Sequence, residues 1–168
     1  MPAFHPIISP YTLILRYISN LVTIYIGGFM KKLLNVAGIY GLLALLSGVF
    51  FREYTKAFDF QGFTTISLTH VHLFVLGSLL FLILALYSKA PTLSRNKNFK
   101  RFMISYNIGL PFMVIMMYVR GITQVQNINL TYEANAALSG IAGISHILVS
   151  LGLIFLFFAL RKTLSESN

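Results

Sequence analysis

The sequence predicts an all-α integral membrane protein, a four-helix up-down-up-down bundle. Hydrophobic residues make up 57% of the 168 residues and charged residues only 10%, whereas about a quarter of the residues of a soluble domain are charged. Four apolar runs are long enough to cross a bilayer, which takes about 20 helical residues. The loops between these runs are short, so consecutive helices should be antiparallel neighbours.

The first thirty residues fit this plan poorly. We expect residues 1–29 to be a doubtful N-terminal extension or an interfacial segment, and residues 30–168 to form one transmembrane domain. The apolar run Tyr11–Phe29 is interrupted by polar residues, which makes it a weak span. Met30-Lys31-Lys32 resembles the start of a membrane protein, and Ile26-Gly27-Gly28 can be encoded by a purine-rich ribosome-binding sequence. We therefore expect translation to begin at Met30.

The spans follow in order from there. We expect the four membrane-spanning helices at Leu33–Phe51, Ile66–Tyr87, Phe102–Val119 and Leu138–Leu160. Small residues favour helix contacts in membranes, so they should mark the faces turned toward the bundle.

Three such inward stripes can be identified at spacings of three and four residues. The first span carries Gly41, Ala44, Gly48 and Arg52. The third carries Tyr106, Gly109, Met113, Met117 (or Met116), Arg120 and Gln124. The fourth carries Ser139, Gly143, His146 and Ser150.

The charge pattern predicts an orientation in a bacterial cell membrane. The net charge of +9 could suggest a nucleic-acid partner, but the basic residues lie between apolar runs, which the positive-inside rule explains better. Four spans place most of them on one side, so both termini should be cytoplasmic. These basic residues are Lys31, Lys32, Lys89, Arg95, Lys97, Lys100, Arg101, Arg161 and Lys162.

Three histidines are the candidate functional residues. His70, His72 and His146 lie inside apolar runs, where an ionisable side chain is costly and therefore suggests function. Residues two apart lie about 200° apart around a helix, so His70 and His72 cannot both face one partner; we favour His72. Arg52 and Arg120 end the first and third spans on the outer side, above the histidines. The fourth histidine, His5, we interpret as incidental.

This group of residues suits a b-type haem. Imidazoles from facing helices can ligate its iron, and arginines near water can pair with its propionates. His146 would be one axial ligand and either His70 or His72 the other, with Arg52 and Arg120 as the propionate partners. The role would be electron transfer or sensing. Hydrolysis is not expected, because no nucleophile is arranged with a base and an orienting acid.

Four alternatives to haem remain open. Copper suits the same histidines together with the thioethers of Met113, Met116 and Met117, which would make the protein a metal permease or a metal-delivery protein. Protonated histidine with the two arginines could instead form a small-anion site. The small-residue stripes could also serve a homo-oligomer or an accessory subunit of a larger membrane complex. The buried groups could equally be hydrogen-bonding residues without a ligand, and whether the protein is an enzyme stays open.

Several stretches resemble a known family. They are Met30–Asn35, Gly48–Lys56, Thr69–Gly77, Val119–Ile122 and Gly140–His146. Through them the chain from residue 30 onward resembles a bacterial family of short four-span integral membrane proteins catalogued as a domain of unknown function. This resemblance implies the four-span fold but no activity. His70–Gly77 also resembles histidine motifs of haem–copper oxidase-type membrane proteins, which favours haem or copper.

Overall fold

The computed structural model describes residues 10–87 and 91–165 of the chain. Within these ranges every regular element is a helix, which confirms the predicted all-α class. The elements are α1 (Pro10–Ala57), α2 (Ile66–His72), the π-helical segment η1 (Leu73–Leu79), α3 (Leu80–Tyr87), α4 (Pro91–Arg95), α5 (Lys97–Val125) and α6 (Tyr132–Ser165).

The four predicted spans are confirmed. Among the described residues, four helical segments are long and apolar enough to cross a membrane: Gly27–Ala57, Ile66–Tyr87, Lys97–Val125 and Tyr132–Ser165. Each contains the predicted span, and three are longer because the helix continues past its most apolar stretch. Many large apolar side chains, among them Ile39, Leu86 and Phe157, are exposed, an arrangement that a soluble protein rarely tolerates and that suits contact with lipid. The chain is therefore a multi-pass membrane protein.

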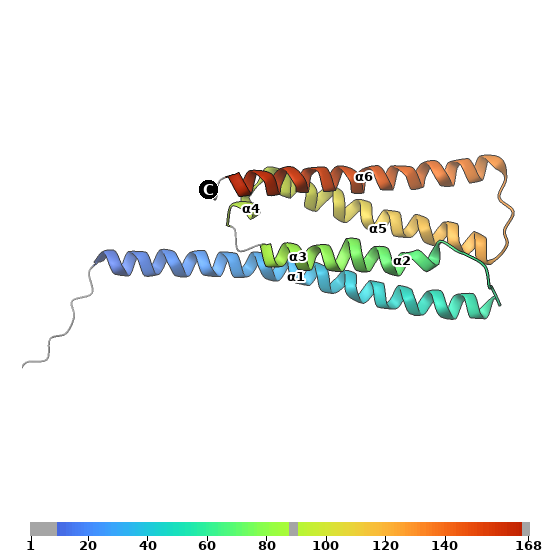
Figure 1. Ribbon diagram of the computed structural model, residues 1–168, viewed down its shortest axis with the longest axis horizontal. Coiled ribbons are helices and arrows are strands. Elements are labelled where there is room, and N and C mark those ends of the chain that lie inside the picture. Colours follow the sequence, from blue (N-terminus) through green and yellow to red (C-terminus); the bar gives the residue numbers. More distant parts are fainter. Residues whose placement is uncertain (1–9, 88–90, 166–168) are drawn as a thin grey trace, which may run out of the picture.

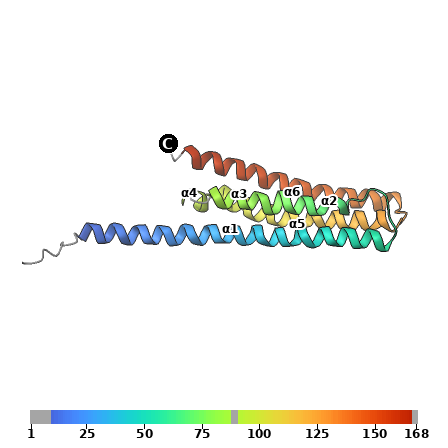
Figure 2. The same cartoon turned by 60° about the horizontal axis from the view of Figure 1, so that its bottom comes forward.

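The helices form a bundle in which the α2–η1–α3 span and α5 lie between α1 and α6 (Figure 1, Figure 2). α1 packs along α2, η1 and α3, whereas α6 packs along α5, and α2 joins the two pairs by contacting α5. The connections 58–65 and 126–131 lie at one end of the bundle, here called the loop end, and α4 lies at the other, the α4 end. Residues 10–29 continue α1 beyond the α4 end as one unbroken helix.

The predicted inward stripes of the first and third spans agree with the packing, apart from Arg52, which is exposed. A side chain at Gly41 would meet Ser78 Oγ at 3.2 Å, and one at Gly48 would meet His70 Cβ at 3.8 Å. Tyr106 and Gly109 are buried on α5.

The predicted stripe of the fourth span is wrong. Ser139, Gly143, His146 and Ser150 are all exposed. The face that packs on α5 lies beside that stripe and includes Ser145, Val149 and Gly152. Its position is set by close backbone contact, since a Cβ on Gly109 would lie 2.9 Å from the backbone nitrogen of Val149. Small residues therefore marked two faces of α6, only one of which packs on α5.

The second span changes its helical pitch directly after His72. The segment η1 is π-helical, a rare geometry that often accompanies functional sites. Its Leu76 carbonyl accepts a hydrogen bond of 2.9 Å from Tyr106 Oη, which reaches across from α5. The Tyr106 side chain is fully buried, so this bond joins α5 to the π-helical segment inside the core.

Tyr106→Phe is expected to destabilise the protein by about 1–3 kcal/mol, because the Leu76 carbonyl loses its side-chain donor in a buried place. Thermal unfolding in detergent, followed by circular dichroism, measures the effect. Tyr132→Phe is the control, since Tyr132 is 84% exposed. An unchanged melting temperature for Tyr106→Phe would show that this bond does not support η1.

Candidate functional site

A groove between α2 and α6, with α5 as its floor, brings together the main sequence-predicted site residues. His72 lines it from α2, His146 from α6 and Arg120 from α5. Its volume is about 500 Å³, within the range of small-molecule and cofactor sites. We call it the His groove. Its remaining lining residues are Thr65, Leu68, Met113, Met116, Met117, Leu138, Ser139, Ala142 and Gly143.

Both histidines of the groove are held in the same way. His72 Nδ1 lies 2.8 Å from the Leu68 carbonyl oxygen, and His146 Nδ1 lies 2.9 Å from that of Ala142. A carbonyl oxygen can only accept, so each Nδ1 must carry the proton, and the tautomer follows from this bonding. In the neutral ring the lone pair then resides on Nε2. Metal-ligating histidines in proteins are oriented by the same kind of Nδ1–H bond.

Arg120 is fixed at the edge of the groove by α6. Its Nη1 donates to Asn135 Oδ1, and its Nη2 donates to Ser139 Oγ at 2.6 Å. These two bonds use two of the five N–H donors of a guanidinium group. The sequence analysis did not identify Asn135, because the predicted span began only at Leu138. The spacing of four residues between Asn135 and Ser139, which places two polar side chains on one helix face, could have indicated it.

The start of α2 is joined to α5 by threonines. Thr64 Oγ1 donates to the Gly121 carbonyl at 3.1 Å, and Thr65 Oγ1 donates to the Met117 carbonyl at 2.8 Å. The Thr65 backbone nitrogen donates to Gln124 Oε1 at 2.8 Å. Because His72 lies two turns further along, these bonds fix its position over α5.

His70 and Arg52 do not line the His groove. His70 faces α1 beside Gly48, and its Nδ1 is buried without a hydrogen-bond partner among the described residues. The Arg52 side chain is 82% exposed and lies 3.9 Å from the Glu53 carboxylate. The structure therefore groups His72 with His146 and Arg120, and it leaves the other two predicted residues apart. His5 lies outside the described residues.

The donor set limits the chemistry of the groove. Within residues 10–87 and 91–165, no three histidine or acidic side chains cluster closely enough to hold a metal ion by themselves. The groove offers two imidazoles, three thioethers and one guanidinium group in apolar surroundings. These groups suit a metal-containing ligand that brings most of the metal's ligands with it, because the groove itself adds few. The guanidinium group suits a negative charge at one edge of that ligand.

A family comparison agrees with the architecture. Residues 30–163 match the model of the family DUF2871, described as a protein of unknown function. No curated protein and no solved structure gives a significant match. The match covers most of the chain, including nearly the whole length of the four apolar helices and every residue of the His groove. The chain therefore belongs to the DUF2871 family of proteins of unknown function.

Proposed function

We propose that the His groove binds a b-type haem, with His72 and His146 as the axial ligands. The observation that carries this proposal is the matched bonding of the two histidines. The two rings lie on different helices, and each donates a hydrogen bond from its Nδ1–H to the carbonyl oxygen four residues before it. With Nδ1 engaged in that bond, each ring would bind the haem iron through its Nε2.

The rest of the groove fits the same ligand. Leu68, Leu138 and Ala142 provide apolar walls for a macrocycle. Arg120, held at the edge by Asn135 and Ser139, can donate to a propionate carboxylate through its remaining N–H groups. Arg52 has no part in this version of the site, because it lies outside the groove.

The role that follows is electron transfer or sensing in a bacterial cell membrane. With haem held by two histidines, both axial positions would be occupied by protein, which favours electron transfer. We infer that both termini are cytoplasmic, so that the His groove opens toward the outer half of the bilayer. The supporting observation is the concentration of basic residues at the α4 end.

Protein purified from haem-supplied cells is expected to show a Soret absorption band, with about one haem per chain by pyridine haemochrome assay. The physical reason is the pair of lone-pair-bearing imidazoles in an apolar groove. The same preparation should be examined by elemental analysis. Protein that contains neither haem nor iron, and that does not take up added haemin, would contradict the proposal.

Copper is the second candidate, and the three methionines of the groove favour it. Met113, Met116 and Met117 line the groove together with both histidines, and imidazole with thioether is a ligand set that suits copper. In this case the protein would carry or deliver the metal. Stoichiometric copper without a Soret band would favour this candidate over haem.

A further inference from the structure

A second furrow, separate from the His groove, runs between α1 and α5. It contains two hollows. One, of about 580 Å³, lies near the α4 end and includes Lys32 and Lys100 in its lining; the other, of about 470 Å³, lies nearer the loop end between Tyr40 and Tyr118. We call them the basic hollow and the apolar hollow.

Both hollows lie along one line. On α5 their lining residues include Lys100, Ile104, Pro111 and Tyr118. Successive members of this series are four or seven residues apart, so they share one face of the helix. On α1, the series Phe29, Leu33, Tyr40, Leu43, Ser47 and Phe50 does the same. The two hollows thus follow one another along the same faces of α1 and α5, and the hydrogen bond of 3.0 Å from Tyr40 Oη to Asn107 Oδ1 joins the two helices between them.

The basic hollow combines two cations with an apolar wall. Lys32 and Lys100 are exposed at its rim, whereas Leu33 and Phe99 are buried behind them. Phe29 packs edge-to-face on Phe99 with ring centroids 5.5 Å apart. Three of the four acidic residues of the chain, Glu53, Asp59 and Glu133, belong to the helix ends and connections of the loop end. Among residues 10–87 and 91–165, therefore, no acidic side chain neutralises these two lysines.

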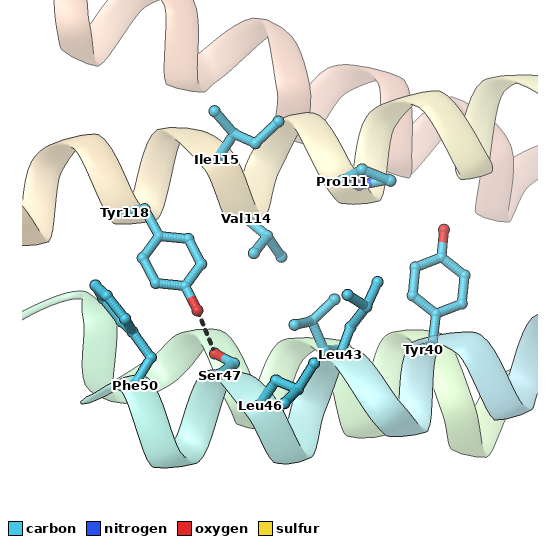
Figure 3. A pocket seen from close by; sticks show the side chains of 10 residues that line it. Tyr40, Leu43, Leu46, Ser47, Phe50, Pro111, Val114, Ile115 and Tyr118 are labelled. Carbon is cyan, nitrogen blue, oxygen red and sulfur yellow. Dashed lines mark hydrogen bonds between the residues drawn. The ribbon is translucent and has the colours of Figure 1, made fainter. Parts of the chain in front are cut away.

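In the apolar hollow the Tyr118 hydroxyl is directed at Ser47, as Figure 3 shows. Tyr118 Oη donates to Ser47 Oγ at 2.7 Å, Ser47 Oγ lies 2.5 Å from Thr69 Oγ1, and Thr69 donates to the Ile66 carbonyl at 2.7 Å. Because the last acceptor is a carbonyl, every hydroxyl proton in this chain is directed toward α2. Tyr40 adds one more hydroxyl, which is bonded to Asn107, and the other walls, such as Leu43, Leu46 and Val114, are hydrocarbon.

We propose that the α1–α5 furrow binds an anionic phospholipid, with its phosphate between Lys32 and Lys100 and one acyl chain in the apolar hollow. The lining from Tyr40 to Leu46 lies about 12–21 Å along the helix from Lys32. Acyl chains of one leaflet reach about that depth, since the hydrocarbon core is about 30 Å thick. Basic pockets between membrane helices are a known way to bind anionic headgroups.

Lipid titration of the full chain by native mass spectrometry tests the headgroup. Phosphatidylglycerol is expected to bind about 30-fold more tightly than phosphatidylcholine with the same acyl chains, since each lysine contributes roughly fivefold. In Lys32→Gln/Lys100→Gln this preference should fall close to one. Lys31→Gln/Lys97→Gln is the matched control, because it removes the same charge from neighbouring positions outside the basic hollow. The control should keep the preference.

A second pair of variants tests the acyl chain. Ile115→Trp fills the apolar hollow and should weaken both lipids at least about tenfold, the value of two buried methylene groups. Ile108→Trp is the control, since Ile108 is equally exposed on α5 at 58% but lines neither hollow. Equal binding of the two lipids, an equal loss in the charge control, or full competition by glycerol phosphate alone would overturn the proposal.

Discussion

Replacing both His72 and His146 with alanine is expected to abolish haem binding, and each single replacement should weaken it at least about 100-fold. Loss of an outer-shell partner of a metal ligand already costs about 10- to 100-fold, so loss of the ligand itself should cost at least as much. Each single variant should also shift the Soret band, because one axial position is then vacated. Haemin titration followed by absorption spectroscopy measures both effects.

His70 is the matched control for this experiment. It is the same residue type, two positions from His72 on the same helix, but it faces α1 beside Gly48. His70→Ala should therefore leave the haem affinity and the spectrum unchanged. Loss of the Soret band in His70→Ala, with retention in His72→Ala, would show that the ligand uses the α1–α2 interface instead of the His groove.

A second set of variants distinguishes ligation by the two histidines from simple hydrogen bonding. His72→Gln and His146→Gln remove the Nε2 lone pair, yet glutamine can still donate a hydrogen bond. If the histidines served only as hydrogen-bond donors, these variants would preserve haem binding better than alanine does. We expect glutamine and alanine to be equally harmful, because the proposed role requires ligation.

Much of the fold could be predicted because membrane spans are determined by local composition. Twenty apolar residues in succession leave little alternative to a spanning helix, and all four spans were located in this way. The α1 and α5 stripes could also be predicted, since Gly41 and Gly109 stand where a partner approaches closely.

The site could be predicted only in part, because helix rotation depends on the partner. On α6, Gly143 and Gly152 are chemically equivalent in the sequence, yet only Gly152 packs against Tyr106. His146 consequently lies beside the buried face, at the rim of a groove, and not in the centre of the bundle. The arginines illustrate the same limit. Arg52 and Arg120 both end a span, but only Arg120 has an Asn135 and a Ser139 opposite it.

The π-helical segment could not be predicted from local sequence. Leu73–Leu79 is an apolar run that would suit an ordinary α-helix. Its geometry accompanies tertiary contacts, namely the Tyr106 bond to the Leu76 carbonyl and the packing of Gly77 against the Tyr40 ring. These partners lie about 30 or more residues away in the chain, so no window of local sequence contains the information.

Gly121→Ala is expected to destabilise the protein by about 3 kcal/mol, at the upper end of the usual cost of overpacking. A Cβ at this position would lie 2.7 Å from the Ile66 backbone nitrogen and 2.8 Å from Thr64 Oγ1. The first of these is backbone, which cannot rotate away, so the beginning of α2 would have to move off α5. The Thr64 bond to the Gly121 carbonyl would be strained by the same movement.

The displacement should also reach the His groove. His72 follows Ile66 by six residues on one helix, so moving the start of α2 moves His72 relative to His146, and haemin affinity should fall together with the melting temperature. Gly38→Ala is the control, because a Cβ there has nothing within 4 Å, and alanine favours the helix by up to about 1 kcal/mol. If Gly121→Ala retained both the stability and the haemin affinity of the unaltered protein, the contact of α2 with α5 could not be what positions His72.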